Sequence, residues 1–113
     1  MSMPDMVTIP SGQIDLDSEF GRAIGFTSDH FEGYGWVING AFWVSCIVSK
    51  EPGKGHFRKL VDRALDLGLT VKIPTPFPRM REICQRYGFQ ETIEDIGWGE
   101  TCQVMVKQPH VAP

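Results

Sequence analysis

The dipeptide Asn39-Gly40 most constrains the fold of this chain, because it separates two segments rich in β-branched and aromatic residues. The segments are Gly33-Tyr-Gly-Trp-Val-Ile38 and Ala41-Phe-Trp-Val-Ser-Cys-Ile-Val-Ser49. A two-residue hairpin turn needs positive φ at both central positions, and Asn-Gly adopts those angles at little cost. The sequence therefore predicts a β-hairpin over residues 33–49.

Helical spacing follows the hairpin, from Gly55 to Leu67. The apolar positions are Phe57, Leu60, Val61, Ala64 and Leu65, which share one face of a helix. Gly68 supplies the left-handed residue that ends a helix, and Leu69–Ile73 is a short β-branched strand. A strand, a helix and a strand with short links predict two parallel strands joined by a right-handed crossover.

The C-terminal third predicts one more helix and a second hairpin. Three alternating prolines make Pro74–Pro78 a stiff loop. Pro78 suits the first turn of a helix over Arg79–Tyr87, with Gly88 as its end. Two further strands, Gln90–Ile96 and Thr101–Lys107, flank a turn at Gly97-Trp98-Gly99.

The first 32 residues carry weaker patterns. We expect a strand around Val7–Ile9 and a helix over Ser18–Ile24 that is capped by Asp17 or Ser18. At 113 residues the whole chain is predicted to be a single domain, with a variable part at 1–32 and a core at 33–107.

Composition excludes several classes of function. Net charge is −3 with 42% hydrophobic residues, so we expect no nucleic-acid partner and no membrane partner. Residues 1–6 lack the basic and apolar regions of a signal peptide, and we expect a cytoplasmic location. The three cysteines (Cys46, Cys84, Cys102) lack CxxC spacing, which favours buried reduced thiols over disulfides or a zinc site, and no metal ligand is predicted.

Two glycines flank Lys54 where the hairpin leads into the helix, in the sequence Lys50-Glu-Pro-Gly53-Lys54-Gly55. A helix N-terminus carries partial positive charge and unpaired N–H groups. Glycines there would let the backbone approach a pyrophosphate, with Lys50 and Lys54 adding charge at the rim. The spacing matches neither a Walker A loop nor a Rossmann fingerprint. The alternative interpretation is a plain turn followed by a flexible helix start.

The order of elements and this loop resemble the GCN5-related N-acetyltransferase (GNAT) superfamily over roughly residues 33–107. The family signature Arg/Gln-x-x-Gly-x-Gly/Ala is matched at Lys50–Gly55 with Lys in first place. The family's helix that ends in Gly-Phe is matched by Gly88-Phe89, and small phage-encoded members look most similar. The resemblance implies an α+β fold (α/β mixed), the acyl-CoA N-acyltransferase fold, in which helices flank a central mixed, mostly antiparallel sheet, with a shortened N-terminal part.

The same resemblance implies that the protein binds acetyl-CoA. The residues that match the family's cofactor-binding segment are Ile47, Val48, Ser49, Lys50, Gly53, Lys54, Gly55, His56 and Phe57. Glu51 lies within that segment and is expected to face water, because an inward carboxylate would repel a phosphate.

The catalytic positions depart from the family pattern. Residues 41–49 contain no carboxylate where many members place a Glu, and Cys84 stands four residues before Gly88 where many place a Tyr. Cys84 is a candidate acid for the leaving thiolate, or else a small buried core thiol. His30, beside Asp29 and Glu32, is a candidate base near neutral pH, or else part of a solvated loop.

Two classes of function remain open from the sequence. One is an N-acetyltransferase that transfers an acetyl group to an unidentified amine. The other is a non-catalytic GNAT-like interaction or structural protein, such as a phage virion or host-directed component. A homodimer that completes the short N-terminal part is a third possibility, in which exposed aromatics would pair. Trp36, Trp43 and Trp98 are expected in the core or at such an interface.

Overall fold

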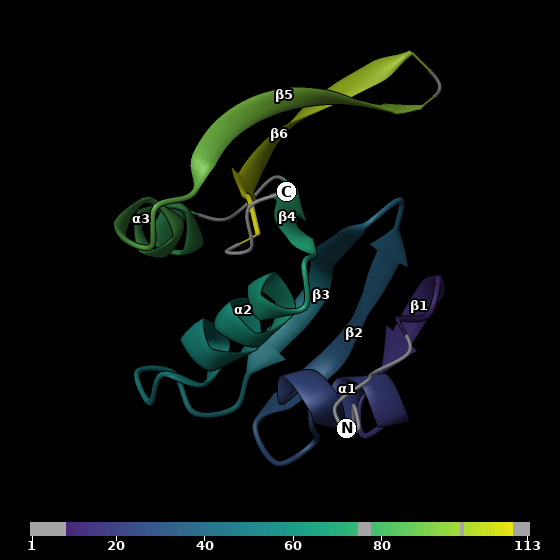
Figure 1. The fold of residues 1–113 in the computed structure, drawn as a ribbon. Helices are drawn as coiled ribbons and strands as arrows, with labels where there is room; N and C mark the ends of the chain where they lie inside the picture. The colour runs from purple at the N-terminus through teal and green to yellow at the C-terminus, as the bar shows by residue number, and fades with distance from the viewer. Residues whose placement is uncertain (1–8, 75–77, 98, 110–113) are drawn as a thin grey trace.

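The computed structural model of the chain describes residues 9–74, 78–97 and 99–109, without the side chains at 45, 46, 79 and 96. Within these ranges, six strands form one sheet in the order β1-β2-β3-β4-β6-β5 (Figure 1). The elements in chain order are β1 (Gly12–Asp15), α1 (Glu19–Ile24), β2 (Phe31–Ile38), β3 (Ala41–Ser49), α2 (His56–Asp66), β4 (Thr70–Pro74), α3 (Pro78–Arg86), β5 (Gln90–Gly97) and β6 (Glu100–Lys107).

The central hairpin is confirmed. Strands β2 and β3 pair antiparallel from Ile38↔Ala41 to Phe31↔Ser49. Asn39 and Gly40 both have positive φ, at 51° and 79°, as a two-residue turn between right-twisted strands requires.

The parallel crossover is also confirmed. Strand β3 pairs parallel with β4, and the other strand pairs are antiparallel. Helix α2 connects the two strands and is followed by Gly68 at φ 88°. The described part of the chain is therefore an α+β structure with a mixed, mostly antiparallel sheet. This fold class agrees with the prediction from the sequence.

The prediction for the N-terminal part is partly wrong. Ile9 lies outside any strand, and the preceding residues 7–8 fall outside the described ranges. The first described strand is instead Gly12–Asp15, in which only Ile14 is buried. A four-residue strand with one buried side chain shows almost no alternation of apolar and polar residues in its sequence. Helix α1 is confirmed, and Ser18 is its N-cap because its Oγ accepts from the Gly21 N–H at 3.0 Å.

The remaining predicted segments agree with the structure where it describes them. Helix α3 begins at Pro78, and Gly88 follows it with φ 86°. The final two strands pair antiparallel as a curved hairpin (Figure 1). The stiff loop before α3 includes residues 75–77, and the last turn includes Trp98, which lie outside the described residues.

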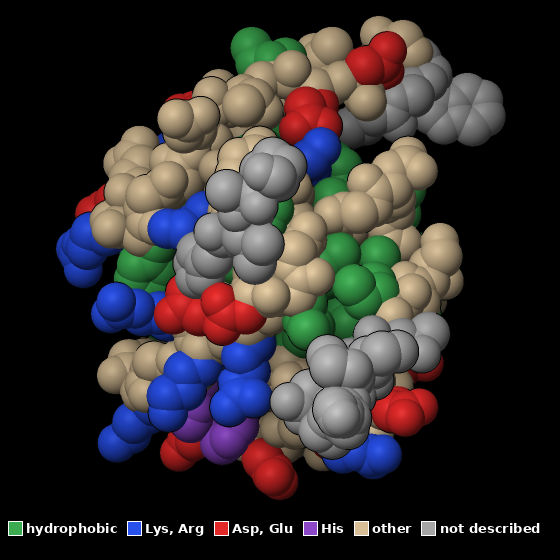
Figure 2. Space-filling view, in the orientation of Figure 1, with side chains coloured by type: hydrophobic (Ala, Val, Ile, Leu, Met, Phe, Trp, Pro, Cys, Tyr) green, Lys and Arg blue, Asp and Glu red, His purple; other side chains and the backbone are tan. Residues whose placement is uncertain are grey.

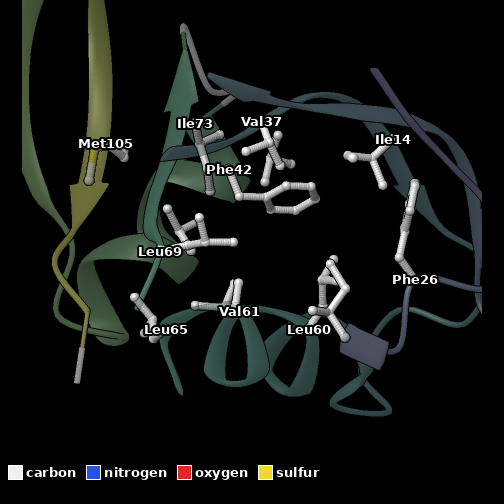
Figure 3. Close-up of a cluster of buried hydrophobic side chains, with 14 of the residues drawn as sticks. Ile14, Phe26, Val37, Phe42, Leu60, Val61, Leu65, Leu69, Ile73 and Met105 are labelled. Atoms are coloured by element: carbon white, nitrogen blue, oxygen red, sulfur yellow. The ribbon is translucent and has the colours of Figure 1, made fainter. Parts of the chain in front are cut away.

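The core lies between the sheet and the helices, with buried side chains from α1, α2 and α3. Figure 3 shows Leu60, Val61 and Leu65 of α2 pointing towards Phe42, Val37 and Ile73 on the strands. Each fully buried side chain of this size stabilises the fold by about 1.5–3 kcal/mol. This packing holds α2 against the sheet, and α2 begins at His56 after the left-handed Gly55.

No helix within the described residues is long and apolar enough to cross a membrane; the longest, α2, has 11 residues.

Candidate functional site

The loop that leads from β3 to α2 is exposed and tightly turned. Gly53 and Gly55 adopt φ of 90° and 82°, in the left-handed region that favours glycine. Residues 50–55 are all exposed, and the Lys54 N–H donates to the Glu51 carbonyl at 3.3 Å. Gly55 is the N-cap of α2, and no side chain caps this helix. The loop therefore presents a helix N-terminus without a side-chain acceptor.

Cationic side chains gather around this helix start. Lys50, Lys54, Arg58 and Lys59 are all exposed, and Glu51 is the one carboxylate in the sequence between positions 50 and 59. Figure 2 shows Lys and Arg side chains grouped around histidines on this part of the surface. The positive end of the helix dipole and these cations act in the same direction, which favours an anionic ligand.

The end of β3 has a free edge beside the loop. Strand β3 pairs with β4 only from Ala41↔Thr70 to Trp43↔Lys72, whereas its pairing with β2 continues to Ser49. Among the described strands, none therefore pairs with residues 44–49 on the side that faces β4. Of the expected cofactor-binding residues in this stretch, Ile47 packs on the core and Val48 is 61% exposed. Phe57, after the loop, also packs partly on the core.

His30, Glu51 and His56 meet at the mouth of the loop. Oε1 of Glu51 lies 3.2 Å from Nε2 of His56 and 3.8 Å from Nδ1 of His30. The two imidazole rings stack, with centroids 3.7 Å apart and planes inclined by 17°. We call these three residues the histidine cluster.

The position of Glu51 refines the expectation that it faces water. Its side chain is 53% exposed, yet its carboxylate contacts both histidines. Sequence reasoning did not bring the three residues together, because 26 positions separate His30 from His56. The signal that could have found them is the hairpin register: Phe31↔Ser49 places His30 opposite Lys50, next to Glu51.

Cys84 lies elsewhere, in the core. Its side chain is fully buried on α3, and burial raises the pKa of the thiol to about 11. A thiol of this kind stays protonated at neutral pH. This placement fits the core role that the sequence left open, and the described residues do not join Cys84 to the histidine cluster. Cys102 is only half-buried, and the side chain of Cys46 is not among those that the structure describes.

Trp36 and Trp43 are not among the residues of the core cluster or those packed against it, so the expected core position is not borne out for these two. Trp36 and Trp43 are half-buried and face each other in the β2–β3 register, while Trp98 is outside the described residues.

A pocket of about 340 Å³ lies between α2, the end of α3 and the end of β6. Its lining residues are Arg58, Val61, Asp62, Arg86, Tyr87 and Lys107. The Arg58 guanidinium carbon lies 5.6 Å from the centre of the Tyr87 ring, and Lys107 donates to the Tyr87 carbonyl. Of the cations around the start of α2, Arg58 also lines this pocket, and Asp62 adds a carboxylate to it. No sequence pattern pointed to this pocket.

No family model matches the chain, and no curated protein or solved structure matches it either. The structure shows an α+β fold with an exposed cationic loop at a helix N-terminus. The resemblance to N-acetyltransferases is a hypothesis that these comparisons do not support.

Proposed function

We propose that residues 50–57 bind the pyrophosphate of acetyl-CoA. The observation that carries this proposal is the left-handed geometry of Gly53 and Gly55 at an α2 N-terminus that no side chain caps. Both glycines have open space where a Cβ would lie, so a ligand could approach the backbone closely. Helix N-termini preceded by glycine-rich loops bind phosphates through backbone N–H groups and the helix dipole.

The surrounding charge supports a ligand with several negative groups. Lys50, Lys54 and Arg58 lie on the loop and the first turn of α2. Arg58 also lines the pocket between α2, α3 and β6, where Arg86 and Lys107 could accept a further phosphate of the same ligand. The Glu51 carboxylate, which would repel such a ligand, is held near two histidines.

The free edge of β3 supports an extended arm that carries amide groups. Residues 47–49 lack a strand partner on the β4 side within the described sheet. An amide-containing chain could add to this edge by strand-like hydrogen bonds. The pantetheine arm of CoA is such a chain, and its thioester end would then lie along β3.

Acetyl transfer would follow from this placement. The amine nitrogen of an acceptor attacks the thioester carbonyl, the C–S bond breaks, and the CoA thiolate takes a proton. A base must first remove a proton from the ammonium form of the acceptor. His30 is the candidate base, since it lies beside the loop and is 38% exposed. Cys84 remains the candidate acid from the resemblance.

A second function, as a non-catalytic interaction protein, is favoured by the burial of Cys84. A fully buried thiol with its pKa raised to about 11 is poorly placed to exchange protons with a ligand. In that case the fold would serve binding of another protein, and the cationic loop would have no CoA ligand.

Calorimetric titration with acetyl-CoA, CoA and ATP tests the proposal. We expect micromolar binding of acetyl-CoA and CoA, about −8 kcal/mol, and its loss in Gly55→Trp. Gly68→Trp is the matched control, because Gly68 ends the same helix with similar φ and equally open space. Normal binding by Gly55→Trp would contradict the assignment of the loop.

The outcome of the same titration separates the two functions. If neither acetyl-CoA nor CoA binds at millimolar concentration, the non-catalytic alternative is favoured. If both bind, the release of free thiol in the presence of a panel of amines measures transfer. His30→Gln is expected to lower that rate while it leaves CoA affinity intact.

A further inference from the structure

We propose that the histidine cluster binds a divalent transition-metal ion, with Zn²⁺ as the best match. Its donor atoms are Nδ1 of His30, Oε1 of Glu51 and Nε2 of His56, and all lie within 4.8 Å of one another. Metal binding at this site can be measured without CoA, although Glu51 and His56 also lie within the proposed pyrophosphate-binding segment 50–57.

The fold itself brings the three ligands together. The β2–β3 ladder ends at Phe31↔Ser49, and the Lys50 N–H donates to the His30 carbonyl at 2.8 Å just beyond it. That bond fixes the segment before β2 against the segment after β3. The two left-handed glycines then turn the chain back, so that His56 begins α2 beside Glu51.

The donor atoms have nearly the spacing that a metal requires. Zn²⁺ binds imidazole nitrogen and carboxylate oxygen at about 2.0–2.2 Å, so two ligands in a tetrahedron lie about 3.4 Å apart. The distances from Oε1 of Glu51 to the two nitrogens are 3.2 and 3.8 Å. The two nitrogens lie within 4.8 Å of each other, so coordination requires them to move closer together and one imidazole ring to turn.

One of the three donor atoms lacks a hydrogen-bond partner in the described part of the chain. Nδ1 of His30 is shielded from solvent and has no hydrogen-bond partner among the described residues. A buried polar atom in this state is costly unless something pairs with it. A metal ion held jointly with Glu51 would satisfy it. Because the rings now stack nearly parallel, one imidazole must turn so that both lone pairs point at the ion.

The ligand set indicates which ion and what kind of site. Two imidazoles and one carboxylate suit Zn²⁺ better than Mg²⁺ or Ca²⁺, which prefer oxygen ligands alone. Three protein ligands leave a fourth position for water or an anionic group. Lys50 and Lys54, which flank Glu51 in the sequence and are exposed, would favour an anion as that fourth ligand.

Titration of the metal-free protein with CoCl₂, followed by displacement with ZnCl₂, tests the site without any CoA. We expect one equivalent of Co²⁺ to give visible d–d absorption without a thiolate charge-transfer band. Glu51→Gln and His56→Gln should each weaken binding more than about tenfold, since even loss of an outer-shell partner costs that much. Circular dichroism confirms that each variant is folded.

Two control variants separate this site from casual metal binding. His110→Gln removes the remaining histidine of the chain, and Glu19→Gln removes an exposed carboxylate on α1; both should bind as the unmodified protein does. No saturation up to millimolar Zn²⁺, or equal affinity in His56→Gln, would overturn the proposal. Neither result would bear on acetyl-CoA binding, which the calorimetric experiment measures separately.

Discussion

Lys72 on β4 and Glu94 on β5 form an ion pair across the intervening strand β6, with Nζ 3.0 Å from Oε1. The same Nζ lies 5.0 Å from the centre of the Trp43 ring on β3. The two side chains are 23% and 26% exposed, so water and salt screen them less than an open surface pair. This contact links the C-terminal hairpin to the centre of the sheet.

Replacement of Glu94 by Gln should lower the free energy of unfolding by about 1 kcal/mol, because the half-buried Lys72 loses its counter-ion. Glu91→Gln is the control: Glu91 pairs with Arg81 at 3.7 Å and both side chains are 37% exposed. We expect a change of less than about 0.5 kcal/mol there. Urea unfolding measures both, and equal effects would show that Lys72–Glu94 is an ordinary surface pair.

Gly35 on β2 should not tolerate a side chain. A Cβ at this position would lie 2.8 and 2.9 Å from two ring carbons of Phe42 and 3.1 Å from the Trp43 carbonyl oxygen. Gly35→Ala should therefore destabilise the fold by about 1–3 kcal/mol through overpacking. The loss should be smaller in a Phe42→Leu background, which removes the opposing ring. Additive losses in a double-mutant cycle would contradict this contact.

Asp17 should contribute to the loss of stability in acid. Hydrogen bonds from the Ser28 side chain and then from its backbone N–H, which lies 3.0 Å from Oδ1, lower the pKa of Asp17 below 3.8. A lowered folded-state pKa gives stability that is present above the unfolded-state value and is lost as pH falls through the folded-state value.

Asp17→Asn keeps a side-chain oxygen acceptor and tolerates the positive φ of 63° at this position, but it cannot titrate. Its stability should therefore fall less between pH 5 and about pH 2 than that of the unmodified protein. Urea midpoints across this range provide the measurement. If the stability of both proteins fell equally between pH 5 and about pH 2, a contribution from Asp17 would be ruled out.

Cys84 should resist thiol reagents while the protein is folded. Burial keeps the thiol protonated, with its pKa raised to about 11, and reagents attack the thiolate. We expect alkylation of Cys84 at pH 8 to proceed only through unfolding, and therefore to accelerate with urea. Cys102, which is half-buried, should react faster. Rapid labelling of Cys84 in the native protein would instead indicate an accessible thiol and strengthen its candidacy as the acid.

The alkaline behaviour follows from the same raised pKa. The folded state resists ionisation of Cys84 between about pH 9 and 11, whereas the unfolded thiol ionises in that range. The stability associated with the protonated thiol is therefore complete below pH 9 and is lost as pH rises. The stability of Cys84→Ala should therefore fall less above pH 9 than that of the unmodified protein. At pH 7 this variant should be less stable, because the smaller side chain leaves a cavity.

The local conformation of much of this chain is determined by its sequence. Asn39-Gly40 specifies the turn because both residues need positive φ, and Gly68 ends α2 for the same reason. The apolar face of α2 likewise fixes which side packs on the sheet. These features depend on neighbours in the chain, so their periodicity and turn residues could predict them.

Only the tertiary structure decided the composition of the site. His30 and His56 stack because the β2–β3 register and the left-handed glycines return two distant segments to one place. The burial of Cys84 depends in the same way on long-range packing. The short strand β1 was missed since it owes its conformation to pairing with β2 rather than to its own pattern. Contacts between distant segments produce no periodic pattern of residues in a single sequence. Such contacts determine which side chains meet in the histidine cluster and how deeply Cys84 is buried.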